Sequence, residues 1–277
     1  MMLIIKDILN LKLYLKAYQE KGYSIGYVPT MGALHQGHAK LLKQSQNDNQ
    51  KTVMSIFVNE KQFNKKEDFD KYPRNKGRDY DFCDSYNVDI IFEPSTEEIY
   101  QDNKPKLKNK YFKNILCDQF RPGHFDGVIT VLNELFSVID TNKVYFGEKD
   151  FQQLKIVEKL IEDKFPNLQL VPVSTERSEE GIAYSSRNEN LSKKQLQEFI
   201  TFHNSVIQFT KSLDRKSQIN EANNLANKFI TNLADQKFDY FEFRNTNSLE
   251  IEGNISNARL FYAIYKGQTR LIDNIEL

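Results

Sequence analysis

The segment SIGYVPTMGALHQGHAKLLKQSQ, residues 24–46, decides the fold. Its first five residues, 24–28, form a short apolar run rich in β-forming residues, which is typical of a buried strand. Residues 37–46 carry apolar side chains at helical spacing and predict an amphipathic helix. A glycine-broken turn with two histidines lies between them. A strand, a turn and a helix in this order indicate the beginning of a βαβ unit.

The same alternation continues along the chain. Further short apolar runs predict buried strands at residues 52–58, 88–93, 143–147 and 168–173. Amphipathic stretches such as 127–139 and 151–165 are long enough to be crossover helices. Because parallel strands need such crossovers, residues 1–173 are expected to form an α/β, Rossmann-like domain around a parallel sheet.

The pattern changes after residue 173. A Ser/Glu-rich loop is followed by two polar helical stretches and then by three strand-like runs, at 192–212, 216–234, 238–245, 258–265 and 269–273. Residues 174–277 are therefore expected to form a smaller C-terminal α+β domain. Residues 265–269 (YKGQT) predict a hairpin turn in which Gly267 supplies the positive φ. The polar segment 101–110 predicts a solvated loop.

Composition narrows the class of protein. The 277 residues carry 38 basic and 38 acidic side chains, so no overall charge favours nucleic acid or a membrane surface as the partner. Residues 1–20 interrupt their apolar pattern with charges, which predicts an amphipathic helix and argues against a signal peptide or membrane span. A cytoplasmic location is the expectation. Cys83 and Cys117 form no C-x-x-C pair and predict buried thiols.

The histidine turn, residues 31–38, should lie at the carboxyl edge of the sheet, where ligands bind in such folds. Gly32 and Gly37 allow close approach of a ligand, and His38 sits at the start of a helix, whose N–H groups and dipole favour anions. Two alternatives are that His35 and His38 only cap or pack, or that they bind zinc. Catalytic zinc needs three protein ligands, whereas the chain has four histidines in all and no H-E-x-x-H motif.

Two further segments follow predicted strands. Gly147–Asp150 opens the next helix, where Lys149 could neutralise phosphate and Asp150 could accept from a ribose hydroxyl or hold magnesium through water. A solvated cap is the alternative. Gln62 lies just past the strand at 52–58, and its amide could orient a carboxylate nucleophile without the strong pairing of an arginine.

A third segment, Ser185–Arg187, brings two hydroxyls and a guanidinium together after a glycine. Such a set fits phosphate oxygens, although the tripeptide alone is a weak signal. The four segments become informative in combination.

The chain resembles the pantoate-beta-alanine ligases (pantothenate synthetases) of the nucleotidylyltransferase superfamily. The resemblance spans residues 29–274 and is carried by PTMGALHQGH, SIFVN with QF, DKYPR, RPGHFDGV, YFGEKDFQQL, SSRN and TRLIDN. It implies that His38 is the catalytic histidine, with His35 contacting phosphates beside it and with Lys149 and Arg187 as further catalytic groups. Gln62 and Gln153 would bind pantoate, and Gln62 would also contact β-alanine. The implied ATP-binding residues are Met31, Gly32, Ala33, Leu34, His35, Gln36, Gly37, His38, Gly147, Glu148, Lys149, Asp150, Glu176, Tyr184, Ser185, Ser186 and Arg187.

The resemblance also implies a reaction in two steps. The pantoate carboxylate attacks the α-phosphorus of ATP to give pantoyl adenylate and pyrophosphate, and the amine of β-alanine then displaces AMP to give pantothenate. Mg²⁺ would accompany ATP, without a firmly assigned protein ligand. The resemblance further implies a homodimer and a C-terminal domain that acts as a lid. A nucleotidylyltransferase acting on a phosphorylated small molecule and a non-catalytic nucleotide-binding module are the competing interpretations.

Three positions depart from the family's pattern. Glu60 stands where proline is usual, Glu176 where a small apolar residue precedes the arginine, and Tyr184 where leucine or methionine is usual. Family contacts at the last two positions lie near adenine and use the backbone. Binding is therefore expected to survive, with different side-chain packing around the base.

Overall fold

The computed structural model describes residues 2–100, 106–233 and 235–277. Its contacts divide the chain into an N-terminal unit, up to Glu148 with Gln153–Ser174, and a C-terminal unit, Lys149–Gln152 with Thr175–Leu277. The four residues 149–152 thus belong to the C-terminal unit by contact, whereas a boundary at residue 173 places them in the N-terminal domain.

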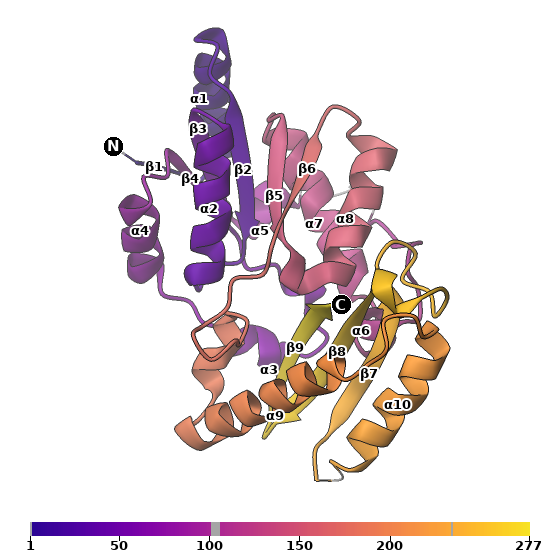
Figure 1. Ribbon diagram of the computed structural model, residues 1–277. Helices are drawn as coiled ribbons and strands as arrows, with labels where there is room; N and C mark the ends of the chain where they lie inside the picture. Colours follow the sequence, from indigo (N-terminus) through magenta and orange to yellow (C-terminus); the bar gives the residue numbers. More distant parts are fainter. Residues whose placement is uncertain (1, 101–105, 234) are drawn as a thin grey trace. The chain divides into compact units, whose positions relative to one another are not determined.

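The N-terminal unit is built on a six-stranded parallel sheet with the order β1-β4-β3-β2-β5-β6. Its strands are β1 (Leu3–Ile5), β2 (Ile25–Thr30), β3 (Lys51–Ile56), β4 (Ile90–Phe92), β5 (Lys143–Gly147) and β6 (Gln169–Val173). The predicted Rossmann-like parallel sheet is confirmed. Figure 1 shows these strands with helices on both sides.

The helices of this unit are α1 (Ile8–Glu20), α2 (Gln36–Asp48), α3 (Lys66–Asp70), α4 (Lys76–Ser85), α5 (Thr96–Ile99), α6 (Leu116–Phe120), α7 (His124–Val138) and α8 (Phe151–Lys164). Successive strand residues face opposite sides of a sheet. Accordingly, Val28 packs in a buried cluster with Leu42 of α2, while Tyr27 meets Phe136 of α7 edge to face. The middle residues of these strands are mostly apolar because helices cover both faces of the sheet.

The prediction for residues 1–20 was wrong in part. The segment forms the short strand β1 and then α1, which begins after Asp7, whose carboxylate accepts the N–H of Asn10 as an N-cap. A three-residue edge strand has too few residues to show the period that distinguishes it from a helix. The predicted loop at 101–110 falls partly outside the described residues; its remainder, 106–110, forms neither helix nor strand.

Strand β2 lies between β3 and β5, so the sequence order of the strands reverses direction there. Such a switch point is where α/β sheets bind ligands, because the segments that follow neighbouring strands diverge to opposite faces. The histidine turn follows β2, the segment of Gln62 follows β3, and Gly147–Glu148 ends β5 and follows it. The sheet order therefore places three of the predicted segments at adjacent strand ends of this unit.

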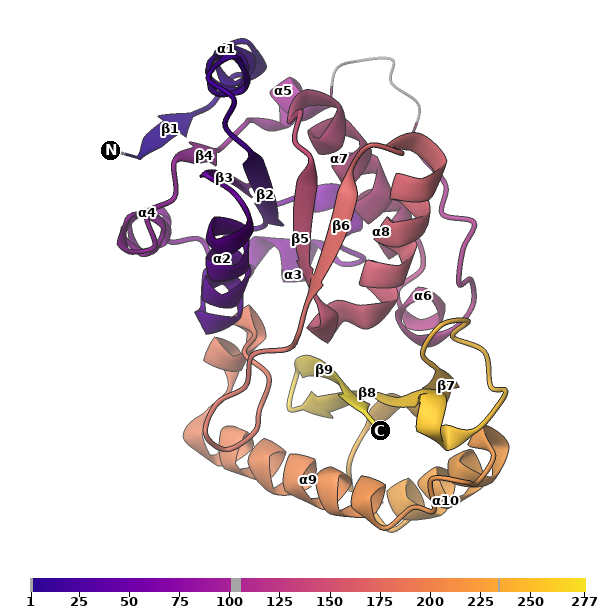
Figure 2. The same cartoon turned by 45° about the horizontal axis from the view of Figure 1, so that its top comes forward.

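The C-terminal unit contains a three-stranded antiparallel sheet, β7 (Phe238–Asn245), β8 (Ala258–Lys266) and β9 (Thr269–Glu276), with the helices α9 (Lys193–Lys211) and α10 (Ile219–Thr231). In Figure 2 both helices lie along one side of these strands. Phe202 of α9, Ala226 of α10 and Phe241 of β7 share the core. The hairpin between β8 and β9 turns at Gly267 with a φ of +60°, as predicted.

Candidate active site

The histidine turn is held by its own side chains. His35, and not His38, is the residue that precedes α2: its Nδ1 accepts the N–H of Gly37 at 3.1 Å. His38 lies in the first turn of the helix, and its Nδ1 accepts the N–H of His35 at 3.2 Å. The expectation that the helix begins at His38 is corrected by two residues. Histidine is absent from the usual set of capping residues, so the sequence did not signal this cap.

These contacts fix the chemistry that the two rings can offer. A nitrogen that accepts a hydrogen bond carries no proton, so the neutral rings of His35 and His38 carry their proton on Nε2. The ring centroids lie 4.1 Å apart. Two neighbouring Nε2–H donors at a helix N-terminus suit the oxygens of a phosphate, whereas a metal would need the same atoms as unprotonated ligands.

The histidine turn is also held by a buried carboxylate, that of Asp79 in α4. Asp79, 3% exposed, accepts the N–H groups of Ala33 at 3.0 Å and Leu34 at 2.8 Å. Gly32 and Ala33 have φ values of 77° and 52°, and this left-handed backbone turns the N–H groups of Ala33 and Leu34 toward the carboxylate. Asp79 occupies this position, so ATP contacts at Ala33 and Leu34 would use atoms other than these N–H groups.

Gln62 is buried, 8% exposed, in the 3-10 turn η1 (Glu60–Gln62) that follows β3. Its Nε2 donates to the sulfur of Met31 at 2.9 Å, which joins the predicted pantoate residue to the histidine turn. Asn59 donates to its Oε1 at 3.0 Å and so fixes the orientation of the amide. Glu60 is the first residue of η1, the helical position at which proline is common, so the departure there is compatible with the turn.

Residues 121–128, the motif RPGHFDGV, contact the turn η1 that contains Gln62. His124 Nδ1 donates to the carbonyl of Gln62 at 2.6 Å, and Asn59 donates to the carbonyl of Gly127 at 3.1 Å. A Cβ atom at Gly127 would lie 2.4 Å from the carbonyl oxygen of Lys61. Only glycine lets α7 approach η1 so closely.

The C-terminal unit gathers a second set of predicted residues. Lys149, Ser185 and Arg187 line one pocket of this unit together with Asp273 of β9. Ser185 precedes the 3-10 turn η3 (Ser186–Asn190), and its Oγ accepts the N–H of Arg187 at 3.3 Å. Three of the lining residues thus carry an ammonium, a guanidinium or a hydroxyl, which are groups that can bind phosphate.

The other predicted residues lie around these two sets. In the N-terminal unit, Gln36 is exposed at the start of α2, Gly37 follows it, Gly147 ends β5, and Gln153 is half-buried in α8. Glu148, Lys149 and Asp150 form the 3-10 turn η2, and α8 begins at Phe151, where the helical stretch 151–165 was predicted. Asp150 is half exposed, and its carboxylate lies 3.7 Å from the Lys149 ammonium.

Glu176 and Tyr184, the two departures near the expected adenine site, face each other across a narrow loop. The N–H of Tyr184 donates to the carbonyl of Glu176 at 3.1 Å, and Arg177 bridges to Ala183 in the same loop. The conformation of this loop depends on these backbone contacts, which do not depend on the identity of the side chains at 176 and 184.

Asp79 and Asp273 were missed by the sequence reasoning. TRLIDN contains Asp273, and Asp79 follows DKYPR in the sequence. A motif does not show which groups a carboxylate faces in the folded protein. No three histidine, cysteine or acidic side chains gather as metal ligands within the described ranges. In the same part of the chain, no helix is long and apolar enough to cross a membrane. Both cysteines are buried as expected, and burial raises the pKa of Cys83 to about 12.

Comparison with known proteins places the chain in a family. The sequence model of the pantoate-beta-alanine ligases matches residues 3–276. The chain is 40% identical to the pantothenate synthetase of Aquifex aeolicus and 37% identical to that of Caldicellulosiruptor bescii, in each case over 99% of this chain and 98% of the relative.

Two solved structures have a similar fold over nearly the whole chain. The pantothenate synthetase of Thermus thermophilus has a TM-score of 0.88 at 30% identity, with 99% of both chains covered. The pantoate-beta-alanine ligase of Francisella tularensis, solved with β-γ ATP and β-alanine, has a TM-score of 0.83 at 33% identity, with 100% of this chain and 98% of that one covered. The chain belongs to the pantoate-beta-alanine ligase family.

Proposed function

We propose that this protein condenses pantoate with β-alanine to pantothenate, through a pantoyl adenylate, with ATP converted to AMP and pyrophosphate. The observation that carries the proposal is the pair of adjacent histidines at a helix N-terminus, whose Nδ1 atoms accept backbone N–H groups of the turn after β2. The pocket lined by Lys149, Ser185 and Arg187 supplies independent support. Both sets bind phosphate by the same physical rule, which is preorganised positive charge and hydrogen-bond donors.

In the first step, the pantoate carboxylate attacks the α-phosphorus and negative charge builds on the phosphate oxygens. His35 and His38 stabilise that charge through Nε2–H, and Lys149 and Arg187 through their cations. Gln62 orients the carboxylate. Because a neutral amide pairs with it less strongly than an arginine would, the carboxylate remains a nucleophile.

A divalent cation belongs to such ATP chemistry, and we propose Mg²⁺. Magnesium commonly takes one or two carboxylates together with phosphates and waters, and the half-exposed Asp150 fits a contact through water. The ion would add positive charge at the phosphates. The protein itself would bind ATP and hold Lys149 next to Asp150.

In the second step, the amine of β-alanine attacks the acyl carbonyl of the adenylate and AMP leaves. We propose that Gln62 contacts β-alanine as well as pantoate. The amine must be unprotonated to attack, so the rate of this step should rise toward alkaline pH. A flat single-turnover rate of the adenylate with β-alanine between mildly acid and alkaline pH would contradict this.

The test of the function is pyrophosphate release from ATP and Mg²⁺. Pantoate alone should give about one pyrophosphate for each protein chain, and β-alanine should convert this burst into continuous turnover. ATP binding without pyrophosphate release would favour a non-catalytic nucleotide-binding module. Release that depends on a phosphorylated acceptor, and not on pantoate, would favour a different nucleotidylyltransferase.

We further propose a cytoplasmic homodimer, which sedimentation analysis and cell fractionation would test. The lid role of residues 174–277 stays a prediction. Small-angle scattering with and without ATP and pantoate would test it, because closure compacts a protein.

A further inference from the structure

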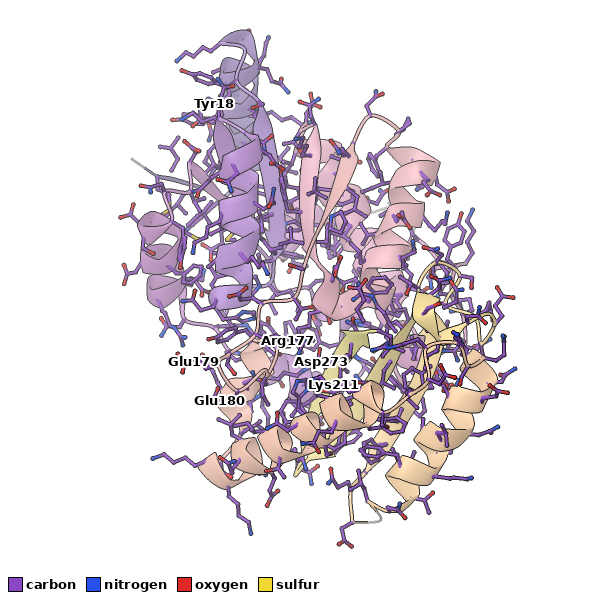
Figure 3. The ribbon with its side chains drawn as sticks, viewed as in Figure 1. Tyr18, Arg177, Glu179, Glu180, Lys211 and Asp273 are labelled. Carbon is purple, nitrogen blue, oxygen red and sulfur yellow. The ribbon has the colours of Figure 1, made fainter. Side chains whose placement is uncertain are left out.

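The loop residue Arg177 and the β9 residues Asp273 and Asn274 have no role in the proposed reaction. All three belong to the C-terminal unit. Figure 3 shows Arg177 and Asp273 next to each other, although they lie 96 residues apart in the sequence. Asp273 also lines the pocket that contains Lys149, Ser185 and Arg187.

The Asp273 carboxylate is fixed by several donors. Arg177 binds it with both terminal nitrogens, at 2.7 and 3.0 Å. The N–H of Asn274 donates to it at 2.8 Å and the hydroxyl of Tyr262 at 3.3 Å. Asp273 is 4% exposed, so solvent screens its charge little. A bidentate arginine pair is the strongest and most directional of such contacts.

Arg177 also connects this carboxylate to the phosphate-binding loop. The same two nitrogens donate to the carbonyl of Gly181 at 3.0 Å and to the carbonyl of Asn274 at 3.0 Å. The backbone of Arg177 forms an isolated antiparallel β-bridge with that of Ala183, and Ser185 follows two residues after Ala183. One guanidinium thus fastens the loop that leads into Ser185 and Arg187 to strand β9.

Asn274 connects the same strand to the turn of Lys149. Its Nδ2 donates to the carbonyl of Lys149 at 2.9 Å, while its Oδ1 accepts from Arg259 at 2.8 Å. Because Oδ1 receives a cationic donor, the amide has one orientation, with Nδ2 toward Lys149. Two adjacent residues of β9 therefore hold the backbone beside both cations of the pocket.

The charge of Asp273 gives this arrangement a second consequence. An uncompensated carboxylate in a pocket for phosphate would repel its ligand, and in a poorly screened site this repulsion is strong. Arg177 neutralises Asp273. Loss of Arg177 would therefore both loosen the loop and expose ATP to a negative charge.

We propose that Arg177, Asp273 and Asn274 are positioning residues that hold Lys149 and Arg187 for the phosphates of ATP, with Arg177 also neutralising Asp273. The proposal rests on the proposed function, because it takes ATP as the ligand of this pocket. Within the TRLIDN motif, it assigns Asp273 and Asn274 a task in nucleotide binding.

The test measures binding of a non-hydrolysable analogue, α,β-methylene ATP with Mg²⁺, by calorimetry, together with KM for each substrate. Arg177→Met should weaken analogue binding and raise KM for ATP by about tenfold, within the range of couplings between contacting residues. KM for β-alanine should change by less than about twofold. The double variant Arg177→Met/Asp273→Asn should bind the analogue more tightly than Arg177→Met alone, since the repelling charge is gone.

The matched control is Arg270→Met. It breaks the pair between Arg270 and Asp239, 2.6 Å apart and similarly buried in the same unit, which does not line the pocket. Analogue binding should be normal there, even if thermal stability falls. If Arg177→Met does not fold, Arg177→Lys and Asn274→Ala carry the test. Arg177→Lys should bind the analogue better than any folded variant with an uncharged residue at position 177, and Asn274→Ala should weaken binding severalfold.

Three results would overturn the inference: unchanged analogue affinity in folded Arg177 variants, equal weakening in Arg270→Met, or a double variant no tighter than the single one. The proposed function fails separately. If wild-type protein binds the analogue but releases no pyrophosphate with pantoate, the reaction is wrong, while the effect of Arg177 on analogue binding remains measurable.

Discussion

The two regions proposed to bind phosphate, the histidine turn and the pocket of Lys149, are built in opposite ways. Each depends on one buried carboxylate, Asp79 in the first and Asp273 in the second. Asp79 binds backbone N–H groups of the turn, whereas Asp273 binds the side chain of Arg177. The turn should therefore depend on backbone conformation, and the pocket on charge pairing between distant side chains.

The largest expected effect is on the rate of adenylate formation, with little effect on stability, when His38 of the histidine turn is replaced. In His38→Asn the amide oxygen can still accept the N–H of His35, as Nδ1 does, but the Nε2–H donor is lost. The rate of adenylate formation should fall about 100- to 1,000-fold. The free energy of unfolding should stay within about 1 kcal/mol of wild type. Pantoate-dependent pyrophosphate exchange and chemical denaturation measure the two.

His38→Gln is the matched variant, because its longer amide can reach the position of Nε2 while it loses the contact with His35. It should retain more activity than His38→Asn and less stability. Equal activity in the two variants would show that Nε2–H does not act on the phosphates.

The next effect tests whether the turn depends on its backbone. Asp79→Ala removes the acceptor of the Ala33 and Leu34 N–H groups, and each unsatisfied group costs about 1–3 kcal/mol. Both unfolding free energy and adenylation rate should fall. Asp118→Ala is the control, since Asp118 is a similarly buried carboxylate that accepts the N–H of Asn114. It should lose stability while the adenylation rate of the folded protein is kept; a matching loss of rate would contradict a special role of Asp79.

A smaller effect concerns the approach of α7 to η1. Gly127→Ala places a Cβ atom against the carbonyl of Lys61, so η1 must shift and carry Gln62 with it. KM for pantoate should rise about tenfold while KM for ATP changes little, and overpacking should cost about 1–3 kcal/mol of stability. Gly77→Ala, where the added Cβ has only an ordinary contact, is the control. Equal rises of both KM values would refute a local effect on Gln62.

The smallest effect is a pH dependence of stability that His203 causes beside Asp273 in the second region. His203, 2% exposed, donates from Nδ1 to the hydroxyl of Tyr262, which itself donates to Asp273. Burial lowers the pKa of His203, an effect that nearby Asp273 opposes and Arg177 reinforces. The unfolded chain therefore binds a proton below pH ~6.5 that the folded chain does not.

Stability from His203 is thus fully present above that pH and is lost as pH falls toward the lowered pKa, by at most about 1.4 kcal/mol for each pH unit. Denaturation at neutral and mildly acid pH should show a shallower loss for His203→Gln than for wild type. An identical pH dependence would mean that His203 becomes protonated in the folded protein.

The sequence predicted the parallel sheet well because its strands are continuous apolar runs separated by amphipathic helices. It failed at β1, whose three residues carry no period, and at the start of α2, which an unusual histidine cap sets. In the site, motifs identified His35, His38, Lys149 and Arg187 as candidates. They did not identify Asp79 or Asp273, since a carboxylate is assigned by what it faces.

The sequence by itself determined the alternation of strands and helices that starts at β2, the hairpin at Gly267 and the residue types available to bind phosphate. These depend on neighbours within a few positions, and local hydropathy and turn chemistry encode such relations. Only the tertiary structure decided which nitrogen of each histidine carries the proton, which N–H groups Asp79 occupies, and that Asn274 holds a carbonyl 125 residues away. The physical reason is that hydrogen bonds and charge pairs need a direction and a distance, which appear only once folding brings remote segments together.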